Sequence, residues 1–210
     1  MLYKYPRTYH LPWSLGSTSD DKILSSVDQF LGKEVVVTVK MDGENTSIYK
    51  DHIHARSLDS KNHISRNWLK NFAQNFQQDI PEDYRLCGEN LFAKHSIHYK
   101  DLKSYFYLFS VWNKEFCLDW DSTIEWASLL GVEVVPVIYR GLWDEKVIKD
   151  LYSEKFLDSE MEGYVVRSTD SFYLDDFSMN VAKFVRKNHV QTEEHWMNQE
   201  IIKNEIKKEE

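Results

Sequence analysis

Residues 34–43 read Glu-Val-Val-Val-Thr-Val-Lys-Met-Asp-Gly, a β-branched apolar run that ends in a lysine followed closely by Asp-Gly. Val and Thr favour extended backbone, so this run predicts a strand. The Asp42-Gly43 pair predicts a turn directly after it. We therefore expect Lys40 at the end of a rigid element, where burial or neighbouring cations can deprotonate its amine and make it a nucleophile.

Further strands and helices are expected on both sides of this run, without strict β-α-β alternation. The strands are expected at residues 45–50, 52–57, 85–89, 105–111, 132–138, 163–167 and 180–185. The helices are expected at residues 20–30, 64–76, 121–130 and 144–152. Ser19 and Asp121 are the expected N-caps of the first and third helices, which Gly32 and Gly131 would end. This order favours an α+β fold with antiparallel sheets, and a cleft between two such sheets would hold a nucleotide.

Length and composition set broad limits on the class of protein. The chain has 210 residues, 42% hydrophobic and 29% charged, which is typical of one soluble globular domain. Its formal net charge of −8 argues against a large nonspecific grip on nucleic acid, although a local basic groove is compatible with it. Cys87 and Cys117 form no C-x-x-C pair, which favours a reducing compartment. Since the sequence shows neither a signal peptide nor an apolar run of about 20 residues, we expect a cytoplasmic protein without a membrane partner.

Lys-x-Asp-Gly alone occurs often by chance, and the simple interpretation of Lys40 is a surface lysine before a hairpin turn. Three other segments change that interpretation. Glu89 ends a predicted strand, Glu162 immediately precedes one, and Lys183 lies within the last one. Residues 105–112 form an aromatic strand between them. A nucleophilic lysine, two carboxylates that can hold a divalent metal, a second lysine and an aromatic platform are the groups that nucleotidyl transfer needs.

In this order, these segments resemble the motifs of the ATP-dependent ligase and capping-enzyme superfamily. The resemblance implies that Lys40, Glu162 and Lys183 are catalytic, with Lys183 on the α-phosphate. It implies that Glu162 and Glu89 hold the metal through water, and that Glu89 also contacts the ribose. Phe109 would pack on the purine, with Tyr107 as second choice. The residues implied to contact ATP are Val39, Lys40, Asp42, Gly43, Arg56, Glu89, Phe109, Glu162, Lys183 and Arg186.

Two positions depart from the pattern of this superfamily. Many relatives carry a second lysine where this chain has Val185, and either Arg186 or Lys187 would have to replace it. Some RNA ligases carry a glutamate that contacts adenine where this chain has Val39, so base contact there would come from the backbone.

Further segments, at residues 6–14, 88–99 and 189–196, resemble the RNA-ligase branch in particular. This resemblance covers about residues 6–197. It implies an ATP-dependent RNA ligase that uses Mg²⁺ (or Mn²⁺), forms a lysyl-AMP on Lys40, and joins the 3′-hydroxyl and 5′-phosphate ends of RNA. His10 lies in the first of these segments, where it would line the substrate path or serve a plain loop role.

We expect a nucleotidyltransferase domain at residues 1–190 and a helical tail at residues 191–210. Only 24 residues follow Arg186 (210 − 186), too few for an OB-fold domain. The RNA grip of longer ligases would then be missing or supplied by another chain, such as a separate RNA-binding or end-processing protein. Three alternatives remain at this point: a guanylyl-transferring enzyme, a DNA-joining enzyme, and a non-catalytic nucleotide-binding module.

Overall fold

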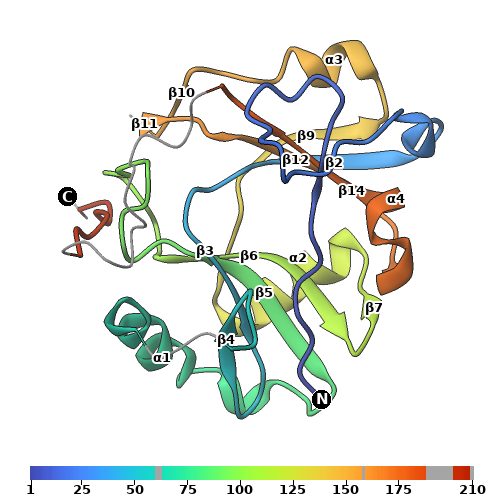
Figure 1. The fold of residues 1–210 in the computed structure, drawn as a ribbon. Helices are drawn as coiled ribbons and strands as arrows, with labels where there is room; N and C mark the ends of the chain where they lie inside the picture. The colour runs from blue at the N-terminus through green and yellow to red at the C-terminus, as the bar shows by residue number, and fades with distance from the viewer. Residues whose placement is uncertain (60–62, 158, 188–200, 209–210) are drawn as a thin grey trace.

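The computed structural model describes residues 1–59, 63–157, 159–187 and 201–208. Two β-sheets face each other, with short helices packed around them (Figure 1). The first sheet has the order β1 (Tyr9–His10), β14 (Val181–Val185), β12 (Gly163–Ser168), β2 (Glu34–Val39) and β9 (Val137–Leu142). The second has the order β13 (Phe172–Tyr173), β7 (Phe116–Cys117), β6 (Phe106–Asn113), β5 (Tyr84–Asn90), β3 (Glu44–Ile48) and β4 (Ile53–Ala55). β8 (Glu133–Val134) pairs with β6, and β10 (Lys155–Phe156) forms a separate hairpin with β11 (Ser159–Glu160).

The α+β class with antiparallel sheets is confirmed. Among the described strands, β1 pairs with β14 and β8 with β6 in parallel, and the other pairings are antiparallel. The apolar run that opens the motif forms β2, between β12 and β9. Val35, Val36 and Val37 are fully buried because both faces of β2 are covered, which explains why the run does not alternate with polar residues.

The helices are short. They are α1 (Asn67–Ala73), α2 (Trp120–Leu130), α3 (Glu145–Lys149) and α4 (Phe177–Asn180), with single 3₁₀ turns at Asp28–Phe30, Ile64–Arg66, Gln77–Asp79 and Leu174–Asp176. Asp119, not the expected Asp121, caps α2, since its carboxylate accepts the backbone N–H of Ser122. Gly131 ends α2 in the left-handed conformation, as expected.

The helix expected at residues 20–30 was wrong, because this segment forms only the 3₁₀ turn at its end. The backbone of His10 holds the chain before that turn: its N–H donates to the carbonyl of Lys22, and its carbonyl accepts from the N–H of Leu24. These bonds keep the segment extended beside β1. A backbone committed to a neighbouring strand cannot also form a helical ladder.

The single strand expected at residues 132–138 divides between the two sheets. Glu133–Val134 pairs with β6, and the chain then crosses to join β2 as β9. Pro136, which has no N–H for a ladder, lies at the crossing, and its carbonyl accepts from the N–H of Val39 at 2.8 Å. The crossing therefore lies directly beside the end of the motif strand.

The described part of the C-terminal tail, residues 201–208, is extended rather than helical as expected. It forms bridges from Lys203 to Ala93 and from Ile206 to Leu102. Its backbone groups are bonded to the loop after β5, which replaces the intrahelical bonds of a helix. Residues 191–200 and 209–210, on which the rest of the helix prediction falls, lie outside the described residues. Within the described part of the chain, no helix is long and apolar enough to span a membrane.

Candidate active site

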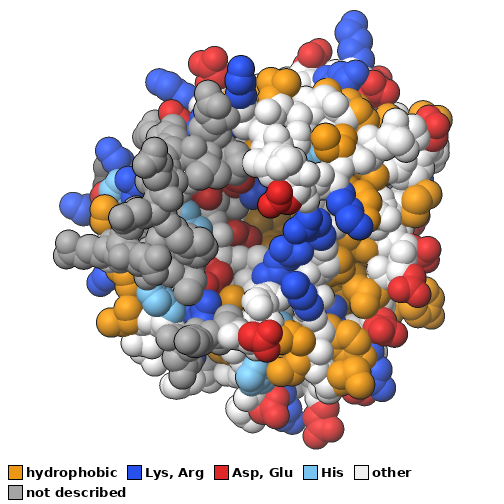
Figure 2. Space-filling model, in the orientation of Figure 1, with side chains coloured by type: hydrophobic (Ala, Val, Ile, Leu, Met, Phe, Trp, Pro, Cys, Tyr) orange, Lys and Arg blue, Asp and Glu red, His pale blue; other side chains and the backbone are white. Residues whose placement is uncertain are grey.

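A cavity of about 660 Å³ lies between the two sheets. Thr38 and Val165 line it from the first sheet, and Phe109 and Ser110 line it from the second. On the face shown in Figure 2, the surface is hollowed near its centre, with Lys and Arg side chains gathered beside the hollow. Its apolar walls with a few polar groups are typical of a nucleotide site.

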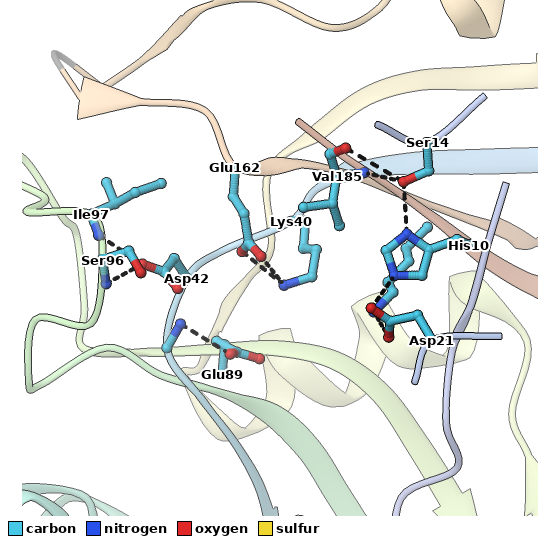
Figure 3. Close-up of polar contacts among 12 residues, drawn as sticks. His10, Ser14, Asp21, Lys40, Asp42, Glu89, Ser96, Ile97, Glu162 and Val185 are labelled. Carbon is cyan, nitrogen blue, oxygen red and sulfur yellow. Dashed lines mark hydrogen bonds and ion pairs between the residues drawn. The ribbon is translucent and has the colours of Figure 1, made fainter. Parts of the chain in front are cut away.

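Lys40 and Glu162 face each other where two adjacent strands meet the cavity (Figure 3). Tyr164 of β12 is paired in register with Val39 of β2, and this pairing brings the neighbouring Glu162 and Lys40 together. Lys40 Nζ donates to both carboxylate oxygens of Glu162 at 2.7 Å. The Glu162 side chain is 4% exposed and that of Lys40 25%. The sequence motifs, 122 residues apart, therefore form one ion pair.

The pKa values of Lys40 and Glu162 depend on burial and on the acidic side chains around them. Burial lowers the pKa of Lys40, but Glu162, Glu89 and Asp42 together raise it above its usual value. Burial raises the pKa of Glu89 to about 8, opposed by Lys40 and reinforced by Glu162 and Asp42. Burial also raises the pKa of Glu162, against the effect of Lys40. The acidic side chains around Lys40, Glu162 foremost, thus favour its protonated form.

Asp42 and Gly43 form the turn that follows Lys40. Asp42 Oδ2 accepts the backbone N–H groups of Ser96 and Ile97, each at 2.7 Å, so its side chain ties the turn to the loop after β5 (Figure 3). The N–H of Gly43 donates to Glu89 Oε1 at 3.1 Å. A Cβ at Gly43 would lie 2.6 Å from the carbonyl oxygen of Asn90, which explains why glycine is needed here.

Lys183 lies in β14, in register with His10 of β1. Its Nζ is 3.8 Å from Asp21 Oδ1, and His10 Nε2 is 3.4 Å from Asp21 Oδ2. Burial and the charge of Lys40 lower the pKa of Lys183, against the effects of Asp21 and Glu162. His10 is 1% exposed and its Nδ1 is 2.7 Å from Ser14 Oγ, so this histidine is a packed group beside Lys183 rather than part of an open loop.

Phe109 and Arg56 belong to the cavity wall. Phe109 has no partner in the β5–β6 register, because Leu108 pairs with Gly88 and Ser110 with Cys87. It is therefore the extra residue of a β-bulge, a feature that re-aims side chains next to active sites. Tyr107 is 3% exposed and absent from the described lining, and its hydroxyl accepts from the N–H of Lys103.

The predicted residues thus fall into two groups. The described lining includes Val39, Lys40, Gly43, Arg56, Glu89 and Phe109. Asp42, Glu162, Lys183 and Arg186 lie beside it, and the N–H of Arg186 donates to the carbonyl of Glu162 at 2.9 Å. The guanidinium of Arg186 pairs with Glu160. The N–H of Val185, where many relatives carry lysine, donates to Ser14 Oγ.

Sequence reasoning missed several residues of the lining. Arg66 forms a bidentate ion pair with Glu44, in which Nε donates to Oε2 at 2.6 Å and Nη2 donates to Oε1 at 2.7 Å. Arg167 and the core residue Trp120 also line the cavity, with the Arg167 guanidinium 5.6 Å from the centre of the Trp120 ring. Glu44 directly follows the Lys40–Gly43 motif, and this position in the sequence could have identified it as a site residue. The partners come from distant segments with no motif of their own.

The described residues contain no group of three or more His, Cys, Asp or Glu side chains arranged to hold a metal ion. Mg²⁺ commonly uses only one or two protein carboxylates and completes its shell with water and phosphate oxygens. Glu89 and Glu162 fit this donor set, because both are carboxylates close enough to Lys40 to perturb its pKa.

The two facing sheets, with a lysine at the edge of the cavity between them, define a nucleotidyltransferase fold. The RNA ligase family model matches residues 33–185, and the chain belongs to this family. Among curated proteins, no match was found.

Solved structures of Naegleria gruberi RNA ligase share this fold. The structure with PPi is 19% identical, with a TM-score of 0.55 over 76% of this chain and 51% of that one. The structure of a mutant with ATP and Mn is 19% identical, with a TM-score of 0.54 over 76% of this chain and 52% of that one. The chain thus spans about half the length of the structures that it matches.

Proposed function

We propose that this chain is the nucleotidyltransferase part of an ATP-dependent RNA ligase that works through a lysyl-AMP on Lys40. The observation that carries the proposal is the contact of Lys40 Nζ with both Glu162 oxygens at 2.7 Å, beside a cavity of about 660 Å³. Family membership and the likeness to a ligase solved with ATP and Mn support the choice of nucleotide and metal.

In the first step, Lys40 Nζ attacks the α-phosphorus of ATP. A P–N bond forms, the P–O bond to pyrophosphate breaks, and the proton that leaves the nitrogen passes to solvent. Glu162 orients the amine through its two hydrogen bonds. Lys183 stabilises negative charge on the α-phosphate oxygens, and Phe109 packs on the adenine. Arg56 and Glu89, which line the cavity, contact the ribose in this proposal.

Glu162 and Glu89 would hold a divalent cation through water, and this ion would neutralise phosphate charge and favour the deprotonated amine. In the second step, an RNA 5′-phosphate oxygen attacks the phosphorus of lysyl-AMP and releases the Lys40 amine. In the third, an RNA 3′-hydroxyl attacks the activated 5′-phosphate, and AMP leaves. In both steps the protein aligns the ends and stabilises charge.

The nucleotidyltransferase domain is proposed to span residues 1–190, with residues 191–210 as its tail. A net charge of −8 supports a separate RNA-binding or end-processing protein as the source of a wider RNA grip. A cytoplasmic location stays a prediction.

Mass spectrometry after incubation with ATP and magnesium tests the proposal. The protein should gain one AMP on Lys40, Lys40→Ala should abolish the adduct, and Lys146→Ala, at an exposed lysine, should retain it. An adduct from GTP instead of ATP would indicate a guanylyltransferase. Sealing of nicked DNA in preference to nicked RNA would indicate a DNA-joining enzyme. If neither nucleotide forms an adduct, the chain is a nucleotide-binding module and the proposal fails.

A further inference from the structure

The described tail, residues 201–208, packs along the loop that joins β5 to β6, residues 91–105 (Figure 1). Backbone bonds connect the two segments along most of their length. Lys94 N donates to the carbonyl of Ile202 at 2.7 Å, Glu205 N to Tyr99 at 2.9 Å, and Lys207 N to Leu102 at 2.8 Å. The tail is therefore bonded at several points to an otherwise irregular loop and gives that loop a fixed backbone conformation.

Asn204 is the centre of this contact, with 1% exposure. Its side-chain oxygen accepts from Tyr99 N at 2.8 Å, and its side-chain amide donates to the Leu91 carbonyl at 2.7 Å. Its backbone N–H donates to the Phe92 carbonyl, and its carbonyl accepts from the Tyr105 hydroxyl. All its polar groups are bonded to the loop, and a buried amide left unpaired is costly, so the residue specifies one position of the loop.

The same loop holds the turn after the nucleophile. The hydroxyl of Tyr99, a residue that is 1% exposed, accepts the backbone N–H of Asp42 at 2.9 Å. Ser96 and Ile97 donate to the Asp42 carboxylate from the same side (Figure 3). One residue, Tyr99, therefore links Asn204 directly to the turn next to Lys40.

We propose that Asn204 is a positioning residue for nucleotidyl transfer, acting through Tyr99 on the Asp42-Gly43 turn. The inference rests on the proposed function. The two amides that bind Asp42 keep its carboxylate turned toward the loop and leave Glu162 as the partner of Lys40. The same turn fixes Glu89 through Gly43 N. A displaced loop would release Asp42 among the charges of the reacting groups and would move Glu89 away from the cavity wall.

The kinetic test compares Asn204→Ala, Tyr99→Phe and the double variant in the full chain. Loss of alignment near the reacting atoms costs roughly ten- to a hundredfold in rate. Each single variant should slow lysyl-AMP formation by that factor at saturating ATP, with the KM for ATP nearly unchanged. The double variant should be no slower than the slower single variant, because both changes break one chain of contacts. Additive effects on the rate would overturn the inference.

Two controls separate positioning from simple stability. Asp144→Ala removes the cap of α3, remote from the cavity, and should lower the melting temperature without changing the rate. Lys207→Ala changes an exposed side chain of the tail and should change neither. If Asn204→Ala lowers the melting temperature like Asp144→Ala but keeps the wild-type rate, the tail only stabilises the fold and the inference is wrong.

Hydrogen exchange without nucleotide tests the physical link apart from any activity. In Asn204→Ala, the amides of Asp42, Ser96 and Ile97 should exchange faster, while amides of β2 stay protected. Unchanged exchange at these amides would overturn the inference even if the wild-type protein forms lysyl-AMP. Conversely, a wild-type protein that forms no adduct would refute the proposed function. The hydrogen-exchange experiment would then still decide whether Asn204 positions the Asp42-Gly43 turn. Should Asn204→Ala fail to fold, Tyr99→Phe keeps the ring and removes the acceptor for Asp42 N, and the same exchange readout applies.

Discussion

In the proposed reaction Lys40 must lose a proton before it attacks phosphorus, yet its neighbours favour the charged form. Glu162 contacts it at 2.7 Å, and the charges of Glu89 and Asp42 add to the same effect. The pair seen here therefore represents a resting state, and added positive charge near the carboxylates is needed to free the amine.

Glu162 and Lys183 should have separable roles in charge stabilisation. The structure pairs Glu162 with Lys40 and places Lys183 beside Asp21. Loss of a charge contact in a shielded site costs roughly 3 kcal/mol, about a hundredfold in rate. Glu162→Ala and Lys183→Ala should each form lysyl-AMP about a hundredfold more slowly while remaining folded, as measured by single-turnover kinetics and circular dichroism.

Metal dependence distinguishes the two roles. Raising the magnesium concentration should partly rescue Glu162→Asp, which keeps a carboxylate, but not Lys183→Ala, which lost a direct phosphate contact. Glu145→Ala, at an exposed pair with Lys149, is the control and should adenylylate at the wild-type rate. Near wild-type rates for both Glu162→Ala and Lys183→Ala would refute these assignments.

Because of Glu89, the free energy of unfolding should decrease as the pH rises. Its pKa is about 8 in the folded protein and 4.5 as the ordinary value, so between these pH values the folded state holds a proton that the unfolded chain has lost. Stability then decreases with pH by at most about 1.4 kcal/mol per pH unit. Glu89→Gln should remove this part of the slope in urea unfolding without metal, while the exposed Glu145→Gln should not. Parallel stability curves for wild type and Glu89→Gln would contradict the assignment.

At the scale of the element, strand register brings the reacting groups together. β12 pairs on one side with β2 and on the other with β14, so Glu162, Lys40 and Lys183 gather around one strand. Gly163 permits this arrangement, because a Cβ there would lie 2.0 Å from the carbonyl oxygen of Phe184. Backbone atoms cannot yield as a flexible side chain can, so β12 and β14 need glycine at this position.

Gly163→Ala should therefore impair both stability and adenylylation. Forced overpacking costs about 1–3 kcal/mol, and the strain lies next to Glu162. Gly141→Ala is the matched control, since a Cβ there meets only the movable hydroxyl end of Tyr139, at 2.9 Å. Urea unfolding and lysyl-AMP formation should both suffer in Gly163→Ala and much less in Gly141→Ala. Equal, small effects would mean that the β12–β14 pairing tolerates a methyl group.

The strands were predictable because β-branched and aromatic runs report burial on a sheet directly, as in residues 34–39 and 106–113. The pairing of the strands was not predictable, since nothing in the sequence around Glu162 indicates that Lys40 lies opposite it on the neighbouring strand. The helix prediction at residues 20–30 was wrong because the backbone of His10, which lies outside that segment, forms hydrogen bonds with it and keeps it extended. The bulge at Phe109 was likewise invisible, because it depends on how β5 and β6 align. Sequence motifs could name site residues, whereas their contacts required the fold.

On the scale of the whole molecule, the cavity lies between two sheets that also pack on each other. Residues from both sheets line the cavity. One core cluster includes Cys87 and Trp112 of the second sheet together with Val181 of the first. A nucleotide bound in the cavity would contact both sheets at once, and any ligand that binds only the folded state raises its stability by mass action.

ATP without metal should therefore raise the melting temperature of Lys40→Ala, a variant that cannot turn the nucleotide over. At a hundredfold excess over Kd the stabilisation is about 2.7 kcal/mol, which for a chain of this size corresponds to roughly 5–10 °C. Phe109→Ala in the same background should lose roughly 2–4 °C of that shift, because an aromatic contact with the base contributes about 1 kcal/mol. Trp126 of α2 stacks on Tyr84, away from the cavity lining. Trp126→Ala should therefore lower the melting temperature while keeping the full increase produced by ATP. A larger shift with GTP would indicate a guanylyl-transferring enzyme, and an undiminished ATP shift in Phe109→Ala would mean that the base does not lie against the bulge of β6.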